Sequence, residues 1–135
     1  MPRLSFGVLA DYAATVQGGK LVIAGEFDSI SPQGLPVVVP STFLVARIEQ
    51  DGEDSDEHIL ALRLTGPSGQ PVSAPSPEQS IRFKPSITPG VGRVQMIVQM
   101  LMLRFPEAGR YEFTLLLDGA PVGTVPFLVK EPKPS

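Results

Sequence analysis

The sequence predicts an all-β protein built as a sandwich of antiparallel sheets. Apolar and polar residues alternate in several short runs, and a period of two is typical of strands with one buried face. Turn-forming residues separate these runs, since the 135 residues include 15 prolines and 13 glycines. Short runs punctuated in this way favour many strands over helices.

The clearest strand lies in the stretch from Phe105 to Gly119. A turn at 106–109 leads into an alternating run, and Asp118-Gly119 then suits a tight hairpin turn. The apolar members of the run are Tyr111, Phe113, Leu115 and Leu117. A tyrosine two residues after a turn glycine matches the tyrosine corner of immunoglobulin-like domains. We therefore expect an immunoglobulin-like antiparallel β-sandwich of about eight strands.

The first hairpin is expected to join 4–16 to 21–27 through Gln17-Gly18-Gly19-Lys20. Two glycines at the centre of the turn would pair Val16 with Leu21 and place Tyr12 over Gly25, covering its bare backbone. This register predicts one continuous core face, made by Ala10, Tyr12, Ala14, Val16, Leu21, Ile23, Gly25 and Phe27. On the other face it places Asp11 directly opposite Glu26, with Asp28 farther along.

The middle of the chain predicts two further core strands, at 42–50 and 58–65. Their inward residues would be Leu44, Ala46 and Ile48, and Leu60, Leu62 and Leu64. The segment 29–41 contains three prolines and is expected to cross the molecule as a long loop, with an edge segment at 37–39. The segment 70–79 is expected to be irregular, and 80–84 to form a short strand.

The segment 94–104 permits a helix, but the prolines and glycines that flank it favour a strand. As a strand it has an even face, with Val94, Met96, Val98, Met100 and Met102, and an odd face, with Gln95, Ile97, Gln99, Leu101 and Leu103. A sandwich strand needs only one apolar face. The second is therefore either covered by the loops 29–41 and 70–79 or forms a contact surface. The candidate interaction residues are Ile97, Leu101, Leu103, Leu35 and Val37.

The last strand, at 122–129, is expected to lie at a sheet edge, because Pro121 and Pro126 each remove a hydrogen-bond donor. Residues 1–130 are long enough to form a single domain with one core. Residues 131–135 are expected to form a flexible C-terminal tail.

Two groups of carboxylates are candidate metal sites. The segment 51–57 carries five carboxylates in seven residues, and calcium prefers such oxygen ligands. Its spacing differs from an EF-hand, and a charged hairpin tip that resists edge aggregation explains it equally well. The weak metal candidates are Asp51, Asp54 and Asp56 in this tip, and Asp11, Glu26 and Asp28 on the hairpin face.

The composition argues against catalysis and against several classes of ligand. The chain has no cysteine and a single histidine, His58, and it lacks a nucleophile elbow and a phosphate-binding loop. We therefore expect no enzyme and no cofactor. A net charge of −3 without basic clusters argues against nucleic acid, and no apolar run is long enough to span a membrane. The absence of cysteine and of an evident leader suggests a cytoplasmic protein.

Three segments together carry a family resemblance. They are Ala10-Asp11-Tyr12-Ala13, then the run from Gly19 to Ile30, and finally Phe105 to Phe113 with Leu117-Asp118-Gly119. In these segments the chain resembles a family of small uncharacterised bacterial proteins, a domain of unknown function with a predicted all-β fold. The resemblance implies the fold and brings no activity, substrate or site residue with it.

The function expected from these observations is protein–protein contact without catalysis. The chain would act as a structural or adaptor module, or would associate with itself as a homodimer. The alternative is a β-sandwich that binds calcium or a small ligand through the acidic loop 51–57 or through the Asp11/Glu26/Asp28 face.

Overall fold

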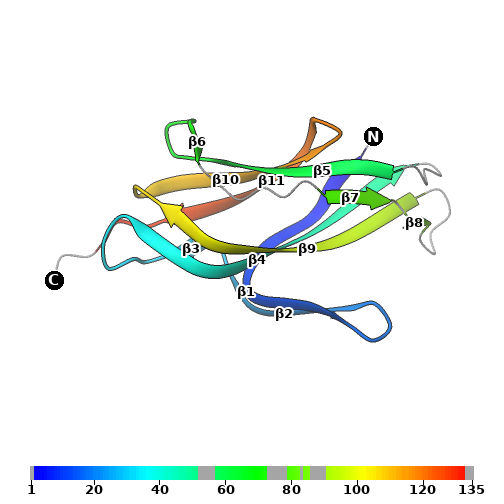
Figure 1. Cartoon of the computed structure of the whole chain (residues 1–135), viewed down its shortest axis with the longest axis horizontal. Helices are drawn as coiled ribbons and strands as arrows, with labels where there is room; N and C mark the ends of the chain where they lie inside the picture. The colour runs from blue at the N-terminus through cyan, green and yellow to red at the C-terminus, as the bar shows by residue number, and fades with distance from the viewer. Residues whose placement is uncertain (1, 52–56, 73–78, 83, 86–90, 133–135) are drawn as a thin grey trace.

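The computed structural model describes residues 2–51, 57–72, 79–82, 84–85 and 91–132. Two sheets face each other as a β-sandwich (Figure 1). Sheet A has the order β2 (Lys20–Phe27), β1 (Arg3–Val16), β4 (Val37–Asp51), β9 (Val91–Phe105) and β8 (Lys84–Pro85). Sheet B has the order β3 (Ser29–Ile30), β11 (Ala120–Val129), β10 (Gly109–Leu117), β5 (Glu57–Thr65) and β6 (Pro71–Val72), and β7 (Gln79–Arg82) also pairs with β5.

The predicted all-β sandwich is confirmed. In the described part of the chain only β3, β6 and β8 are as short as two residues, which leaves eight longer strands. All ladders there are antiparallel except the one between β11 and β3. That short parallel ladder pairs Leu128 with Ser29 and Val129 with Ile30, so one end of β11 is covered rather than forming a free edge.

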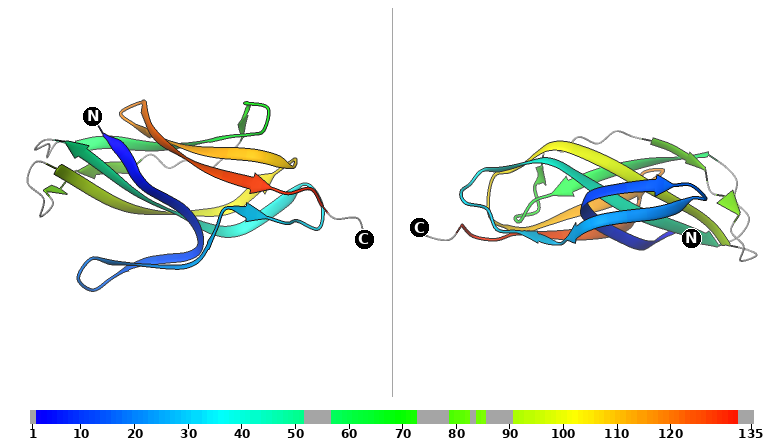
Figure 2. Two further views of the ribbon diagram at one scale, coloured as in Figure 1. Left: turned by 180° about the vertical axis from the view of Figure 1, so that it is seen from behind. Right: turned by 90° about the horizontal axis from the view of Figure 1, so that it is seen from below.

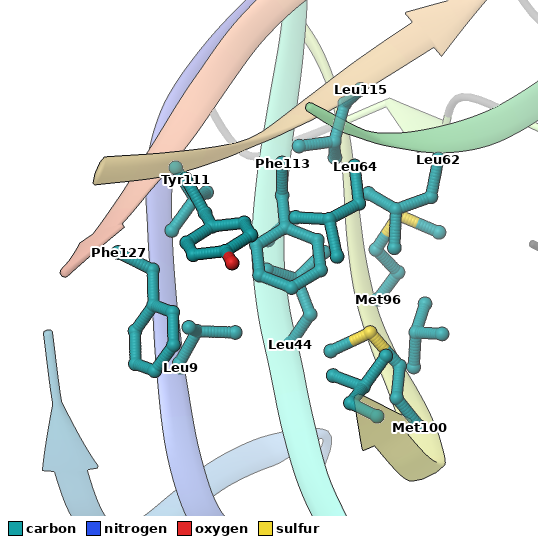
Figure 3. Close-up of a cluster of buried hydrophobic side chains, with 14 of the residues drawn as sticks. Leu9, Leu44, Leu62, Leu64, Met96, Met100, Tyr111, Phe113, Leu115 and Phe127 are labelled. Atoms are coloured by element: carbon teal, nitrogen blue, oxygen red, sulfur yellow. The ribbon is translucent and has the colours of Figure 1, made fainter. Parts of the chain in front are cut away.

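The core lies between the two sheets (Figure 3). Each strand contributes the alternate residues that face inward, as the period of two predicts. The central members are Leu9, Leu44, Ala46, Ile48, Leu60, Leu62, Leu64, Met96, Val98, Met100, Tyr111, Phe113, Leu115, Val125, Phe127 and Val129. Aromatic rings fill one end, where the Phe105 ring lies 4.9 Å from the Tyr111 ring and 5.1 Å from the Phe127 ring, measured between centroids. The inward faces predicted for β4, β5, β10 and β11 are thus confirmed.

The tyrosine corner suggested by the sequence has the expected hydrogen bonds. The hydroxyl of Tyr111 donates to the carbonyl oxygen of Glu107 at 2.6 Å and accepts from the backbone N–H of Glu107 at 3.3 Å. Both bonds tie the turn before β10 to the strand itself. Desolvation by burial raises the pKa of the Tyr111 hydroxyl, because the charged phenolate is disfavoured away from water.

A joint change of face occurs in β4 and β9. The ladder keeps one register from Val37 opposite Phe105 to Asp51 opposite Val91. In β4, Thr42 faces the core, Ser41 and Pro40 both lie outward, and Val39 faces inward again. In β9, Met100 faces the core, Leu101 and Met102 both lie outward, and Leu103 faces inward again. Met102 has a φ of 55°, a conformation that L residues rarely adopt. At this level the alternation between core-facing and outward-facing side chains is reversed in both strands. The predicted even and odd faces of β9 therefore hold only as far as Met100.

The predicted register of the first hairpin is wrong by one residue. Val16 pairs with Lys20, and Tyr12 with Ala24. The loop has three residues, because Gly18 and Gly19 both take positive φ and the N–H of Gly19 donates to the carbonyl of Val16 at 3.1 Å. A shift of one residue moves a whole strand's side chains to the other face. Tyr12 and Val16 are accordingly 51% and 44% exposed rather than part of the core.

The open side of the sandwich near β1 is closed by a close approach of β1 and β11. A methyl group added at Gly123 would overlap Cβ of Leu4, and one added at Gly7 would lie 2.7 Å from Cγ2 of Val125. The two sheets meet here because both strands carry glycine where a side chain would separate them.

We predict that Gly123→Ala lowers the free energy of unfolding by about 1–3 kcal/mol, since the added methyl group forces β1 and β11 apart. Urea denaturation measures the effect. Gly34→Ala is the matched control, because nothing lies within 4 Å of the added methyl group there. Equal stabilities for the two variants would show that the close approach carries no packing role.

We predict that Tyr111→Phe costs about 1–2 kcal/mol at neutral pH, because the Glu107 carbonyl loses its donor. The exposed Tyr12→Phe is the control. The unfolded chain releases the tyrosine proton near pH 10, whereas the raised pKa keeps Tyr111 protonated in the folded chain. Wild-type stability should therefore fall relative to Tyr111→Phe above about pH 10. Parallel stability curves for the two proteins across this range would contradict the account.

Candidate interaction surface

The outer face of sheet A is apolar over three adjacent strands. Its side chains point away from the core because they alternate with the inward residues of β1, β4 and β9. We call this set the apolar outer face: Phe6, Val8, Tyr12, Phe43, Val45, Ile97 and Leu101. In the ladders, Val8 lies beside Val45 and Val45 beside Ile97. The result is a continuous row of aliphatic side chains across the sheet.

Aromatic and cationic side chains extend this row. The rings of Tyr12 and Phe43 lie 5.7 Å apart with an interplanar angle of 50°. The guanidinium of Arg47 lies 5.7 Å from the centre of the Phe6 ring, a cation–π contact. Arg47 Nη2 also donates to Gln95 Oε1 at 2.9 Å. Aromatic rings and the Arg47 guanidinium are thus in contact with one another on this face.

The outer face of sheet B has a different character. Its members include charged and hydroxyl side chains from β5, β10 and β11: Arg63, Thr65, Arg110, Glu112, Thr114 and Thr124. Arg110 and Glu112 approach each other at 3.7 Å. Exposed apolar side chains such as Ile59 and Leu128 lie at its margins. Ala61 and Leu116 pair in the middle of this face, and Arg47, Gln95 and Gln99 lie on the outer face of sheet A, so the two faces differ in their proportion of charged side chains.

A two-stranded hairpin extends the apolar side of the molecule. β1 pairs with β4 only as far as Ala10, where the hydroxyl of Thr42 donates to the Ala10 carbonyl at 3.2 Å. Beyond that point β1 pairs with β2 alone, and we call residues 11–26 the hairpin arm. Figures 1 and 2 show the arm turning away from the sandwich and running below sheet A. Tyr12, Val16 and Val22 on the arm are 51%, 44% and 43% exposed.

One polar atom on this side of the molecule lacks a partner. Nε of Arg47 is buried and donates to no acceptor in the described part of the chain. A buried donor without an acceptor costs about 1–3 kcal/mol.

The structure places some of the interaction residues suggested by the sequence on the outer face of sheet A and others in or against the core. Ile97 is half-buried on the apolar outer face, and Leu101 there is 57% exposed. Leu103 is 1% exposed and belongs to the core, and Leu35 and Val37 also pack against the core. Leu103 faces the core because the alternation of side chains reverses at Met102, which is itself 66% exposed. Sequence reasoning missed Phe6, Val8, Tyr12 and Phe43, although their alternation with the core residues of β1 and β4 could have indicated them.

The structure does not bring the predicted carboxylates together. Glu26 pairs with Ala10, so Asp11 and Glu26 do not face each other across the hairpin. The Asp11 side chain instead covers Gly25, where an added methyl group would collide with it. Asp51 receives a hydrogen bond of 3.1 Å from Arg3 Nη1. Asp54 and Asp56 lie outside the described residues, and within the described ranges no three potential metal ligands converge.

Two small clefts lie elsewhere on the surface. One of about 510 Å³ is lined by Gln70, Pro71, Val72, Met102, Arg104 and Pro106. One of about 310 Å³ is lined by Asp28, Ser29, Arg110, Pro126, Phe127 and Leu128. His58, the only histidine of the chain, contacts Asp118 with Nδ1 2.6 Å from Oδ2, and Asp118 Oδ1 accepts from the backbone N–H of Ile59 at 3.0 Å. This pair joins the β10–β11 turn to the start of β5 and lies in neither cleft.

Comparison with known proteins places the sequence within a family. Residues 5–130 match a family of unknown function, DUF6941. The chain belongs to this family. No curated protein matches the sequence. Along the described residues, no helix is long and apolar enough to cross a membrane.

Solved structures also resemble this chain at low sequence identity. The Pseudomonas fluorescens alkylpurine DNA glycosylase AlkC, bound to DNA containing an abasic site analogue, shares 10% identity over 96% of this chain, with a TM-score of 0.53. The β-glucosidase D2-BGL of Chaetomella raphigera shares 16% identity over 95% of this chain, with a TM-score of 0.47. A β-D-glucoside glucohydrolase of Trichoderma reesei shares 15% over 96%, with a TM-score of 0.46. The chain spans 30%, 18% and 19% of these three proteins, respectively.

We predict that Thr42→Val lowers the free energy of unfolding by about 1–2 kcal/mol, because the buried Ala10 carbonyl loses its donor while side-chain shape is kept. The arm should also loosen at its base, so amides of 11–16 should exchange hydrogen faster in the variant. Thr124→Val, an exposed site on the outer face of sheet B, is the control. Unchanged stability and exchange would mean that Thr42 does not hold the point where β1 leaves β4.

Proposed function

We propose that this protein is a non-enzymatic protein-interaction module that binds its partner through the apolar outer face. The observation that carries the proposal is the difference between the two outer faces. The outer face of sheet B carries Arg63, Arg110 and Glu112. The outer face of sheet A carries a row of aliphatic and aromatic side chains, in which Tyr12 and Leu101 are 51% and 57% exposed and Val45 is fully buried. A sandwich strand needs one apolar face for its own core, so the second apolar face of sheet A points to a contact outside the chain.

The chemistry of this face fits protein binding. Aromatic side chains and arginine are enriched at the centres of protein interfaces, and Tyr12, Phe43, Phe6 and Arg47 lie together here. Burial of a side chain such as Leu101 contributes about 1.5–3 kcal/mol.

The strand order supports an immunoglobulin-like assignment, which we adopt as part of the proposal. In such domains one sheet has the order A-B-E-D and the other G-F-C. Strands β1, β4, β9 and β8 follow the first order, and β11, β10 and β5 follow the second. β2 is then an additional strand, which lies between the first two strands in sequence and outside β1 in the sheet. We place the module in the cytoplasm, since a chain without cysteine needs no oxidising compartment.

We predict that Leu101→Lys weakens partner binding by tenfold or more, because it puts a charge into the apolar outer face. Affinity capture with the tagged chain identifies the partner, and titration with the purified partner then measures Kd. Ile59→Lys is the matched control, since Ile59 is 51% exposed on the outer face of sheet B. Loss of binding in Ile59→Lys but not in Leu101→Lys would contradict the proposal, and so would the absence of any stoichiometric partner.

A further inference from the structure

The hairpin arm ends sheet A with an open edge. β2 is eight residues long, and no other described strand pairs with its outer side. Among the described strands, β8 covers part of the outer side of β9, β3 part of that of β11, and β6 and β7 parts of that of β5, so β9 and β11 also have unpaired stretches. An unpaired edge of this length is a template for pairing with another strand. An isolated two-stranded hairpin is also only marginally stable in water, so the arm would gain stability from a third strand.

The sequence of β2 is self-complementary in charge. Lys20 and Glu26 lie at opposite ends of the strand, with Ile23 midway between them. Both charged side chains are exposed. In the ladder with β1, Lys20 pairs with Val16 and Glu26 with Ala10, so the two charges lie near opposite ends of the paired part of the strand. An antiparallel copy of the strand centred on Ile23 would therefore meet opposite charges at both ends.

We propose that two copies of this chain associate by antiparallel pairing of their β2 strands, with the two Ile23 residues facing each other across a two-fold axis. In this register Lys20 of each copy lies opposite Glu26 of the other, and Val22 lies opposite Ala24. A shift of one residue leaves both lysines without a facing carboxylate, and a shift of two places Lys20 opposite Ala24 or opposite Asp28, which lies beyond the end of β2. Opposite charges across an antiparallel ladder stabilise it, and like charges destabilise it, so the charge pattern selects this register.

An exposed apolar side chain lies at this edge. Pairing would cover Val22, which is 43% exposed on the open edge of the arm.

The symmetry has a consequence for partner binding. A two-fold axis between antiparallel strands is perpendicular to the sheet, so both copies present the same face on the same side. The two apolar outer faces would then lie on one side of a continuous sheet. A dimer of this kind would bind a bivalent partner more tightly than a single copy could. The inference uses the main-chain edge of β2, and it goes beyond the proposed function without depending on the same surface.

Sedimentation velocity on the full chain from about 1 to 100 µM tests the inference. We expect wild type to approach twice 14.4 kDa. Lys20→Glu and Glu26→Lys each place two like-charge pairs at the interface, and each should weaken the dimer at least about tenfold. The double variant Lys20→Glu/Glu26→Lys recreates the pairs with exchanged signs and should return to within about threefold of wild type. Arg63→Glu, with the same change in net charge as Lys20→Glu, should have no effect.

Each alternative result overturns the inference. A wild type that stays monomeric across the range excludes the dimer. A dimer insensitive to both single reversals forms through another surface, and a double variant that stays dissociated excludes the register. Circular dichroism of each variant confirms that the sandwich is folded. Leu101→Lys separates this inference from the proposed function. Loss of partner binding with an intact dimer supports both. Loss of the dimer in Leu101→Lys alone would place self-association on the apolar outer face and contradict the inference.

Discussion

The ladder between β4 and β9 is the constraint on which the rest of the structure depends. It keeps one register over the length of both strands, and it places Leu44 beside Val98 in the core and Val45 beside Ile97 on the outer face. Both strands exchange faces together at Pro40 and Met102, so the ladder continues while the sheet presents different side chains beyond that level. The pairing of β4 with β9 thus positions side chains of both the core and the apolar outer face. A change that slipped this register would disturb both at once.

Much of the fold followed from local pattern. The strands β4, β5, β10 and β11 each have one apolar face, and alternation identified those faces because burial and strand geometry share the same period. The tyrosine corner was also predictable, since Gly109 and Tyr111 specify it by spacing alone. The hairpin register was not, because Gln17-Gly18-Gly19-Lys20 is compatible with loops of two or three residues and a single residue reverses the faces. Leu103 was misplaced for a related reason: no local signal marks the positive φ of Met102.

The candidate surface depends on tertiary context that the sequence reveals only in part. Ile97 and Leu101 could be singled out because both faces of their strand are apolar. Phe43 and Tyr12 could not be grouped with them until β1, β4 and β9 were known to be neighbours. The arm is a similar case. Its apolar residues look like core residues in sequence, yet β1 leaves β4 at Ala10 and the hairpin continues alone. Residues that would be core in a longer sheet are exposed here, and Tyr12 joins the arm to the apolar outer face through its ring contact with Phe43.

Hydrogen–deuterium exchange of the full chain at several protein concentrations is the most direct test of this account. Contact through the arm predicts that amides of β2 become protected as concentration rises, with no change in β11, whose outer edge also lies largely open among the described strands. Equal exchange of β2 at all concentrations, in a protein whose mass nevertheless increases, would show that the arm is not the contact between copies.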